Sequence, residues 1–101
     1  MAYWTIVLED ERKNTLALLD AELHVNENQY NYLTTKVNGF NLLCYLDPYG
    51  DVTFNCLQID DLTADLQRLK NADNSDLVDQ IISLAKRCKE ESHTYLAFCG
   101  D

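Results

Sequence analysis

Residues 38–58 read NGFNLLCYLDPYGDVTFNCLQ, and the predicted fold follows from the two turns within this segment. The dipeptide NG at residues 38–39 is typical of a two-residue hairpin loop, because both of its positions favour positive φ. DPYG at residues 47–50 suits a type I turn, since proline presets φ and glycine accepts a left-handed conformation. Together the turns predict a three-stranded antiparallel meander, with strands expected at residues 30–37, 40–46 and 52–58.

The two turns also predict a single register for this meander. They place a common set of apolar residues on one face, and a slip of one residue in either turn would destroy the agreement. This buried face is expected to contain Leu33, Val37, Phe40, Leu42, Cys44, Leu46, Val52, Phe54 and Cys56. The opposite face mixes polar residues with tyrosine and leucine, so we expect either an interface or cover by an N-terminal helix. It comprises Tyr32, Thr34, Lys36, Asn41, Leu43, Tyr45, Thr53, Asn55 and Leu57.

The rest of the chain supplies strands and helices around the meander. Residues 3–8 are β-branched and aromatic and predict a first strand. Residues 14–23 carry leucines at helical spacing, so a short helix is predicted there, although they could instead form a second strand. Further helices are expected from Asp60, which places acid at the positive helix end, and from a Ser75 cap. A last strand, residues 93–99, should pair with an edge of the sheet.

This order of elements predicts an α+β fold, in which two or three helices pack on one face of an antiparallel sheet of about five strands. The length of 101 residues, with 47% hydrophobic and 25% charged residues, suits one soluble domain spanning 1–101. No apolar run approaches the about 18–20 residues that a membrane helix needs. The chain also starts without the basic region of a secretory signal, so we expect a cytoplasmic protein without a membrane partner.

Charge is the strongest global property of the sequence. Seventeen acidic residues against eight basic ones give a net charge of −9. Binding to nucleic acid or anionic membrane is disfavoured, because phosphates are bound by clustered lysine and arginine. A basic protein partner is favoured, since the negative field would accelerate its association. Solubility alone is the competing explanation of the charge.

No motif predicts catalysis, a metal site or a cofactor. His24 and His93 stand beside no serine, cysteine or aspartate in a known nucleophile motif, and only three glycines leave no phosphate-binding loop. Clustered aspartates could gather around Mg²⁺ or Ca²⁺, but their spacing matches no EF-hand and local turns and caps explain them. A small metal-dependent hydrolase that uses these aspartates is therefore retained only as an alternative to a non-enzymatic protein.

The four cysteines are predicted to be buried free thiols. Cys44, Cys56, Cys88 and Cys99 share no close metal-binding spacing, and each lies within an apolar pattern. Their even number would also permit disulfides.

An uninterrupted acidic segment supplies the candidate binding residues. Residues 37–67 contain five aspartates and no lysine or arginine. Short aspartate side chains at ordered turns accept charge-assisted hydrogen bonds from arginine and lysine, and nearby tyrosines are typical anchors of protein interfaces. The predicted partner-binding residues are Asp47, Tyr49, Asp51, Tyr45, Asp60, Asp61 and Asp65. A solvated acidic rim without a partner is the competing interpretation.

Two motifs, DPYGDxxFNxLQ at residues 47–58 and HTYLxFxGD at residues 93–101, resemble signatures of small acidic bacterial immunity proteins. These proteins neutralise toxins of contact-dependent inhibition and other polymorphic toxin systems. The resemblance covers up to the C-terminal two-thirds of the chain. It implies a cytoplasmic protein, monomeric alone, that forms a heterodimer with one cognate toxin domain, often a basic nuclease, and blocks its active site. A nucleic-acid mimic is a further alternative, although two short helices do not obviously offer duplex-like charge spacing.

Overall fold

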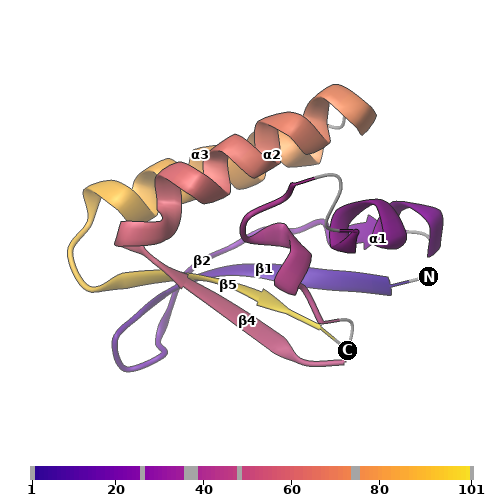
Figure 1. The fold of residues 1–101 in the computed structure, drawn as a ribbon. Coiled ribbons are helices and arrows are strands. Elements are labelled where there is room, and N and C mark those ends of the chain that lie inside the picture. The colour runs from indigo at the N-terminus through magenta and orange to yellow at the C-terminus, as the bar shows by residue number, and fades with distance from the viewer. Residues whose placement is uncertain (1, 26, 36–38, 48, 74–75, 101) are drawn as a thin grey trace.

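The computed structural model describes residues 2–25, 27–35, 39–47, 49–73 and 76–100. Within them the chain forms an α+β fold with a five-stranded antiparallel sheet and three α-helices (Figure 1). The strands are β1 (Ala2–Asp10), β2 (Thr15–Leu18), β3 (Leu23–Val25), β4 (Asp51–Asn55) and β5 (Thr94–Cys99). The α-helices are α1 (Glu27–Thr34), α2 (Ile59–Asp73) and α3 (Asp76–Glu90), and two short 3₁₀ helices are η2 (Leu43–Tyr45) and η3 (Cys56–Gln58).

The strands follow the order β2-β1-β5-β4, and β3 pairs with the first residues of β1. The C-terminal strand β5 therefore lies between β1 and β4 (Figure 1). The prediction that this strand pairs at an edge of the sheet is wrong, because it is central. The path of four strands ends at β4 on one side and at β2 on the other, and β3 pairs with β1 off this path.

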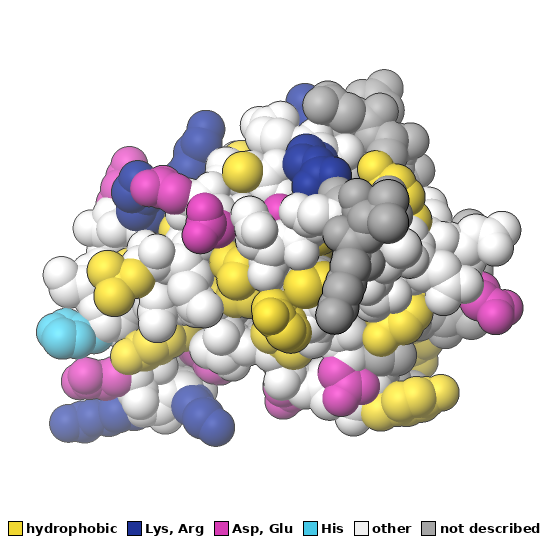
Figure 2. Space-filling model, viewed as in Figure 1, with side chains coloured by type: hydrophobic (Ala, Val, Ile, Leu, Met, Phe, Trp, Pro, Cys, Tyr) yellow, Lys and Arg dark blue, Asp and Glu magenta, His cyan; other side chains and the backbone are white. Residues whose placement is uncertain are grey.

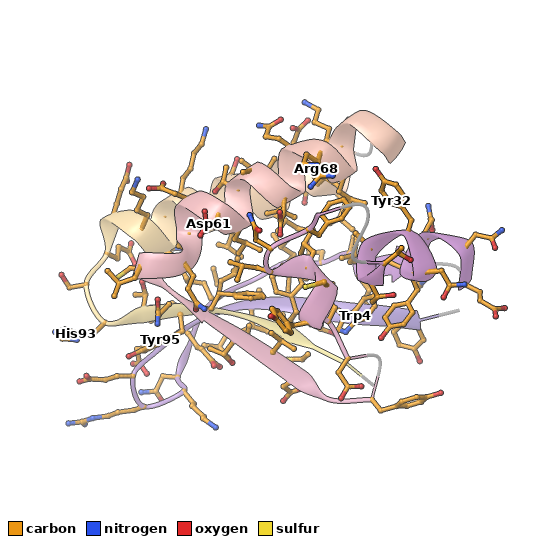
Figure 3. All side chains as sticks on the ribbon, in the orientation of Figure 1. Trp4, Tyr32, Asp61, Arg68, His93 and Tyr95 are labelled. Atoms are coloured by element: carbon orange, nitrogen blue, oxygen red, sulfur yellow. The ribbon has the colours of Figure 1, made fainter. Side chains whose placement is uncertain are left out.

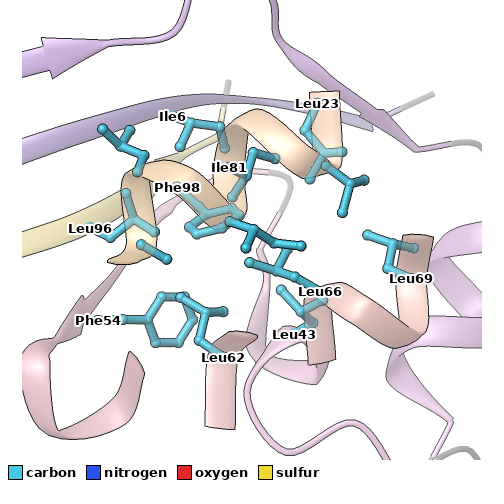
Figure 4. Close-up of a cluster of buried hydrophobic side chains, with 14 of the residues drawn as sticks. Ile6, Leu23, Leu43, Phe54, Leu62, Leu66, Leu69, Ile81, Leu96 and Phe98 are labelled. Atoms are coloured by element: carbon cyan, nitrogen blue, oxygen red, sulfur yellow. The ribbon is translucent and has the colours of Figure 1, made fainter. Parts of the chain in front are cut away.

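The helices lie on one face of this sheet, as predicted, and the core fills the space between them (Figures 1 and 4). Strand residues alternate in direction, so every second residue of β1 points at the helices. Trp4, Ile6 and Leu8 are fully buried there. Helices α2 and α3 present apolar stripes to the same core, which also includes Leu62, Leu66, Leu69, Val78, Ile81, Ile82, Ala85, Cys88, Leu96 and Phe98. The predicted helices α2 and α3 are thus confirmed, while Ser75 lies outside the described residues.

The predicted meander is wrong, because only its third strand forms. Strand β4 occupies part of the predicted 52–58 strand and pairs with β5 instead of residues 40–46. The predicted 30–37 strand is replaced by α1, and Thr34 Oγ1 donates a hydrogen bond to the carbonyl of Tyr30 in its last turn. Most of the apolar set is nevertheless buried or half-buried, Leu33, Phe40, Leu46 and Phe54 fully. A helix and an irregular segment satisfy the same burial requirement as the predicted strands.

Two details of the predicted faces also change. Leu43 was expected on the open face but is fully buried, and Cys56 was expected in the core but is exposed. All four cysteines are free; Cys88 is buried, and Cys44 and Cys99 are half-buried. The prediction of buried free thiols therefore fails for Cys56. Lys36, Val37 and Asn38, including the first residue of the NG dipeptide, lie outside the described residues.

The N-terminal segment takes the strand alternative, and the predicted helix at residues 14–23 is wrong. Asp10 at the end of β1 explains the hairpin, because its carboxylate accepts hydrogen bonds from the backbone N–H groups of Arg12 and Asn14. These bonds lower the pKa of Asp10, the one from Asn14 most strongly. Lys13 adopts a left-handed φ of 65° in this turn.

In the part of the chain that the structure describes, no helix combines the length and the apolar character needed to cross a membrane.

Candidate protein-binding surface

The segment between α1 and β4 occupies the place of the predicted meander. Its described residues are 39–47 and 49–50, hereafter the connecting segment, and apart from η2 it has no regular structure. It runs between α2 and the sheet, next to α1 (Figure 1). Phe40, Leu43 and Leu46 point into the core and anchor it at a spacing of three residues.

Asp65 of α2 fixes the middle of the connecting segment. Its carboxylate accepts three backbone hydrogen bonds, from the N–H groups of Asn41 at 3.2 Å, Leu42 at 2.7 Å and Leu43 at 3.1 Å. Only 1% of Asp65 is exposed. The expectation that Asp65 lies on the outer side of its helix and contacts a partner is therefore corrected: this carboxylate holds the fold together from inside.

Three further side chains hold the two ends of the connecting segment. Arg68 Nη1 donates to the Gly39 carbonyl at 2.9 Å, and its guanidinium lies 4.3 Å from the ring centre of Phe40. Trp4 Nε1 donates to the Asp47 carbonyl at 2.9 Å, and the Tyr30 hydroxyl donates to the Leu46 carbonyl at 3.2 Å. Figure 3 shows Arg68 reaching the segment from α2 and Trp4 reaching it from β1. Elements on several sides thus fix its backbone.

Beyond these anchors, the connecting segment and the residues after it expose large side chains. Tyr45 is 67% exposed, Tyr49 87% and Leu57 88%, and these are the three most exposed large hydrophobic residues of the described chain. Leu57 was expected on an open face but not among the binding residues. The sequence feature that could have identified Leu57 is an apolar residue on the face predicted to lie opposite the core.

A turn closes at residues 47–50, where it was predicted, but Gly50 does not adopt the left-handed conformation expected of it. The Gly50 N–H group donates to the Asp47 carbonyl at 3.3 Å, and the Asp47 carboxylate accepts the N–H of Tyr49 at 2.9 Å. A Cβ atom at Gly50 would lie 3.0 Å from Asp47 Oδ2, so a side chain there would require the Asp47 carboxylate to shift. Pro48 lies outside the described residues. The turn holds Tyr49 outward, between the exposed carboxylates of Asp47 and Asp51.

Asp60 and Asp61 lie at the other end of β4, in the first turn of α2. Both are exposed, and Figure 3 shows Asp61 at the start of α2. Asp60 Oδ1 pairs with Lys89 Nζ at 2.6 Å, but both side chains are more than half exposed. Such a surface pair adds little stability and leaves the carboxylate accessible. Six of the seven predicted binding residues are therefore exposed. Asp47, Tyr49, Asp51, Asp60 and Asp61 flank β4 along the chain, and Tyr45 lies in η2 of the connecting segment.

The negative charge also reaches the sheet beside β4. Asp51 pairs with Cys99 of β5 across the strands. Burial raises the pKa of the Cys99 thiol, and the charges of Asp51 and Glu9 raise it further. In Figure 2, the lower right of the visible face carries acidic and hydrophobic side chains without a lysine or arginine among them. This part of the molecule disfavours anions and favours cations.

A hollow of about 400 Å³ lies between the β1–β2 turn and the α3–β5 turn. Its lining mixes signs, with Arg12 and His93 beside Asp10, Glu11 and Glu91. His93 Nδ1 lies 3.7 Å from Glu11 Oε2, and both side chains are largely exposed. Within the described residues, no three His, Cys, Asp or Glu side chains converge as a metal site would require. The aspartates of residues 37–67 are distributed among a turn, a helix start and the core.

The two motifs behind the immunity-protein resemblance are neighbours in space. They contribute β4 and β5, which pair along their whole length, and the Gly100 N–H donates to the Gly50 carbonyl at 2.9 Å. Comparison with protein-family models, curated proteins and solved structures finds no match to this chain.

Proposed function

We propose that this chain is a non-enzymatic immunity protein, which acts in the cytoplasm by binding one basic toxin domain and occluding its active site. It is a monomer alone and forms a heterodimer with that toxin. The observation that carries the proposal is the connecting segment, whose backbone is fixed from within while Tyr45 and Tyr49 stand exposed among aspartates.

Fixed backbone and exposed aromatic rings favour binding for an entropic reason. Association costs the freedom of every side chain and loop that it orders. Asp65, Trp4 and Arg68 already hold the backbone around Tyr45 and Asp47, so little of it has to be ordered by a partner. Tyrosine is a frequent energetic centre of protein interfaces, because it buries a large rigid ring and keeps a polar hydroxyl.

The exposed aspartates favour a basic partner over other proteins. Aspartates flank the exposed rings, and a partner rich in lysine and arginine would be attracted before contact and then form charge-assisted hydrogen bonds. A solvated acidic rim would account for the aspartates alone. It does not account for three highly exposed large hydrophobic side chains within residues 45–57.

A growth assay tests this proposal. We predict that a large secreted protein is encoded immediately upstream of this chain, and the C-terminal domain of that protein is the toxin domain to use. Expressed alone it should stop bacterial growth, and co-expression of this chain should restore growth and give a complex that copurifies. If the wild-type chain neither restores growth nor copurifies with that domain, the proposed function is wrong.

Replacing Tyr49 with alanine should weaken that complex by about tenfold to thirtyfold in Kd, as for a central interface tyrosine. The melting temperature should stay unchanged, because the ring is almost fully exposed. Leu18→Ala is the matched control, since Leu18 is also exposed but lies on the opposite edge strand. Titration calorimetry with the purified toxin domain measures both variants. Equal weakening by both variants, or by neither, would remove Tyr49 from the interface.

A further inference from the structure

Strand β4 has one open side. It ends the strand order β2-β1-β5-β4, and within the described residues its strand partner is β5 alone. A strand at an edge presents unpaired N–H and C=O groups that another chain can pair with. Natural edges are commonly protected by lysine, proline or a bulge. Residues Asp51–Asn55 contain neither lysine nor proline, and their register with β5 is regular.

The hydrogen-bond pattern shows which groups point outward. In an antiparallel pair, successive residues alternate between bonding the neighbouring strand and pointing away from it. The Gly50 carbonyl accepts a hydrogen bond from the Gly100 N–H group and so points towards β5. By alternation, the backbone N–H and C=O groups of Val52 and Phe54 point towards β5 as well. The backbone groups of Asp51, Thr53 and Asn55 then point to the open side.

Two independent bonds agree with this assignment. The N–H of Asn55 donates to Gln58 Oε1 at 3.0 Å, which a group engaged with β5 could not do. On the far side of the sheet, the Ile6 carbonyl accepts from the N–H of Leu19, so the even residues of β1 face β2 and the odd ones face β5. The same alternation therefore runs through the whole sheet. It leaves Asp51 and Thr53 as the residues of β4 with outward N–H and C=O groups in the described structure.

The side chains around this edge match a cationic strand. Tyr49 and Leu57 stand exposed just before and just after β4, and exposed aspartates accompany each of them. No lysine or arginine occurs from residue 37 to residue 67. A basic segment laid along β4 would thus meet Asp47 and Asp51 at one end and Asp61 towards the other, beside Asp60, which pairs with Lys89. An exposed apolar side chain stands at each end.

The opposite edge, β2, lacks these properties. Arg12 and Lys13 lie in the turn that leads into it, and its pairing with β1 shifts register between Leu8 and Glu9. A bulge of this kind disturbs strand addition. The two edges of the sheet therefore differ in regularity, although acidic residues, among them Glu11 and Asp20, also lie near β2.

We propose that the partner docks by adding an extended, basic segment to the free edge of β4, with its backbone paired to Asp51 and Thr53. This inference rests on the proposed function of binding a basic protein. The outward backbone groups of Asp51 and Thr53 are about 6.8 Å apart along the strand, so a segment of about four to six residues is long enough to pair with both. Val7 of β1, Ala97 of β5 and Thr53 of β4 lie side by side across the sheet. A residue of the added strand would continue this row on the face opposite the helices.

Amide hydrogen exchange measured by NMR tests the inference directly. The probe is a ten-residue peptide of alternating arginine and valine, with a glutamate–valine peptide as its charge control. At saturating arginine–valine peptide, the Asp51 and Thr53 amides should exchange at least about tenfold more slowly than in the free protein, since hydrogen-bonded strand amides are protected. The glutamate–valine peptide should leave them unchanged.

A pair of proline variants supplies the second arm. Thr53→Pro removes an outward N–H without removing a bond to β5, and should weaken peptide binding at least about tenfold, since proline cannot donate to an added strand. Leu18→Pro is the matched control, because Leu18 also points outward, on the β2 edge, and should leave peptide binding unchanged. Should Thr53→Pro fail to fold by circular dichroism, the exchange rates of the wild-type protein alone decide the question.

Several results would overturn strand addition at β4. These are no binding of the arginine–valine peptide, protection of other amides only, unchanged binding by folded Thr53→Pro, or equal binding of the glutamate–valine peptide. Protection that appears without peptide and grows with protein concentration would instead identify a second copy of this chain as the occupant. A Thr53→Pro variant that still restores growth leaves the proposed function intact, whereas a wild-type chain that fails to restore growth removes that function itself.

Discussion

Replacing Asp65 with alanine should lower the free energy of unfolding by about 3 kcal/mol, because one buried and two part-buried backbone N–H groups lose their acceptor. The carboxylate of Asp65 accepts hydrogen bonds from the N–H groups of Asn41, Leu42 and Leu43. Truncation also leaves a cavity beside Leu43, which is fully buried. Urea denaturation followed by far-ultraviolet circular dichroism measures the change.

Asp61→Ala is the matched control for this variant. It removes the same group one helical turn earlier from an exposed position, so the free energy of unfolding should change by no more than about 0.5 kcal/mol. Asp65→Asn should fall between the two, because its carbonyl oxygen replaces only part of the carboxylate. Equal stability of the two alanine variants would show that Asp65 does not anchor the connecting segment.

Trp4→Ala should lower the free energy of unfolding by about 3–5 kcal/mol, the usual effect of deleting a large buried aromatic ring. Trp4 is fully buried, lies 6.4 Å from the ring of Tyr30 and donates to the Asp47 carbonyl. Trp4→Phe retains most of the packing, so its smaller effect, about 1–2 kcal/mol, reports mainly the lost hydrogen bond. Trp4 is the one tryptophan of the chain, so both Trp4 variants lack tryptophan fluorescence. Their unfolding is therefore followed by circular dichroism.

Tyr30→Phe serves as the comparison for Trp4→Phe, because it removes only the hydroxyl that bonds the Leu46 carbonyl. Its effect should be about 1 kcal/mol, since the site is partly open to water. If Trp4→Ala were tolerated within about 1 kcal/mol, the tryptophan would not be packed as the structure has it.

Helices α2 and α3 and strands β1, β4 and β5 were predictable from local patterns, whereas α1, β2 and β3 were not. In α3, apolar residues occur on one face, Asp76 and Asp79 occupy the first turn, and Arg87 and Lys89 the last. These signals act within one element and need no distant partner. The burial of Val78, Ile81 and Ala85 follows from the same spacing.

The partner of β4 was not predictable in the same way. The turn at residues 47–50 correctly indicates a strand after it, but hairpin signals favour the preceding segment as its neighbour. In the structure β5 takes that place, 40 residues or more along the chain. A missed signal was the continuous apolar run of Leu96, Ala97 and Phe98, all buried, which is more typical of a central strand than of an edge.

The binding surface was predictable where its residues serve turns and helix starts. Asp47 and Asp51 flank a turn whose geometry exposes their side chains, and Asp60 and Asp61 begin a helix. Asp65 resembles them in sequence but is drawn inward by three amides from a segment more than twenty residues away. No local pattern distinguishes such a buried acceptor from a solvent-exposed aspartate.

The most direct test of an acidic docking surface at β4 is the association rate constant with the purified toxin domain, measured over a range of salt concentrations. Asp47→Asn/Asp51→Asn should slow association by about threefold to tenfold at low salt and flatten its salt dependence, because local charge steers encounter. The matched control is Asp20→Asn/Glu22→Gln, which removes the same charge from the exposed connection between β2 and β3. It should change the rate constant far less. Equal rates for the Asp47/Asp51 variant and the wild type, or equal slowing by both variants, would contradict a docking surface at this place.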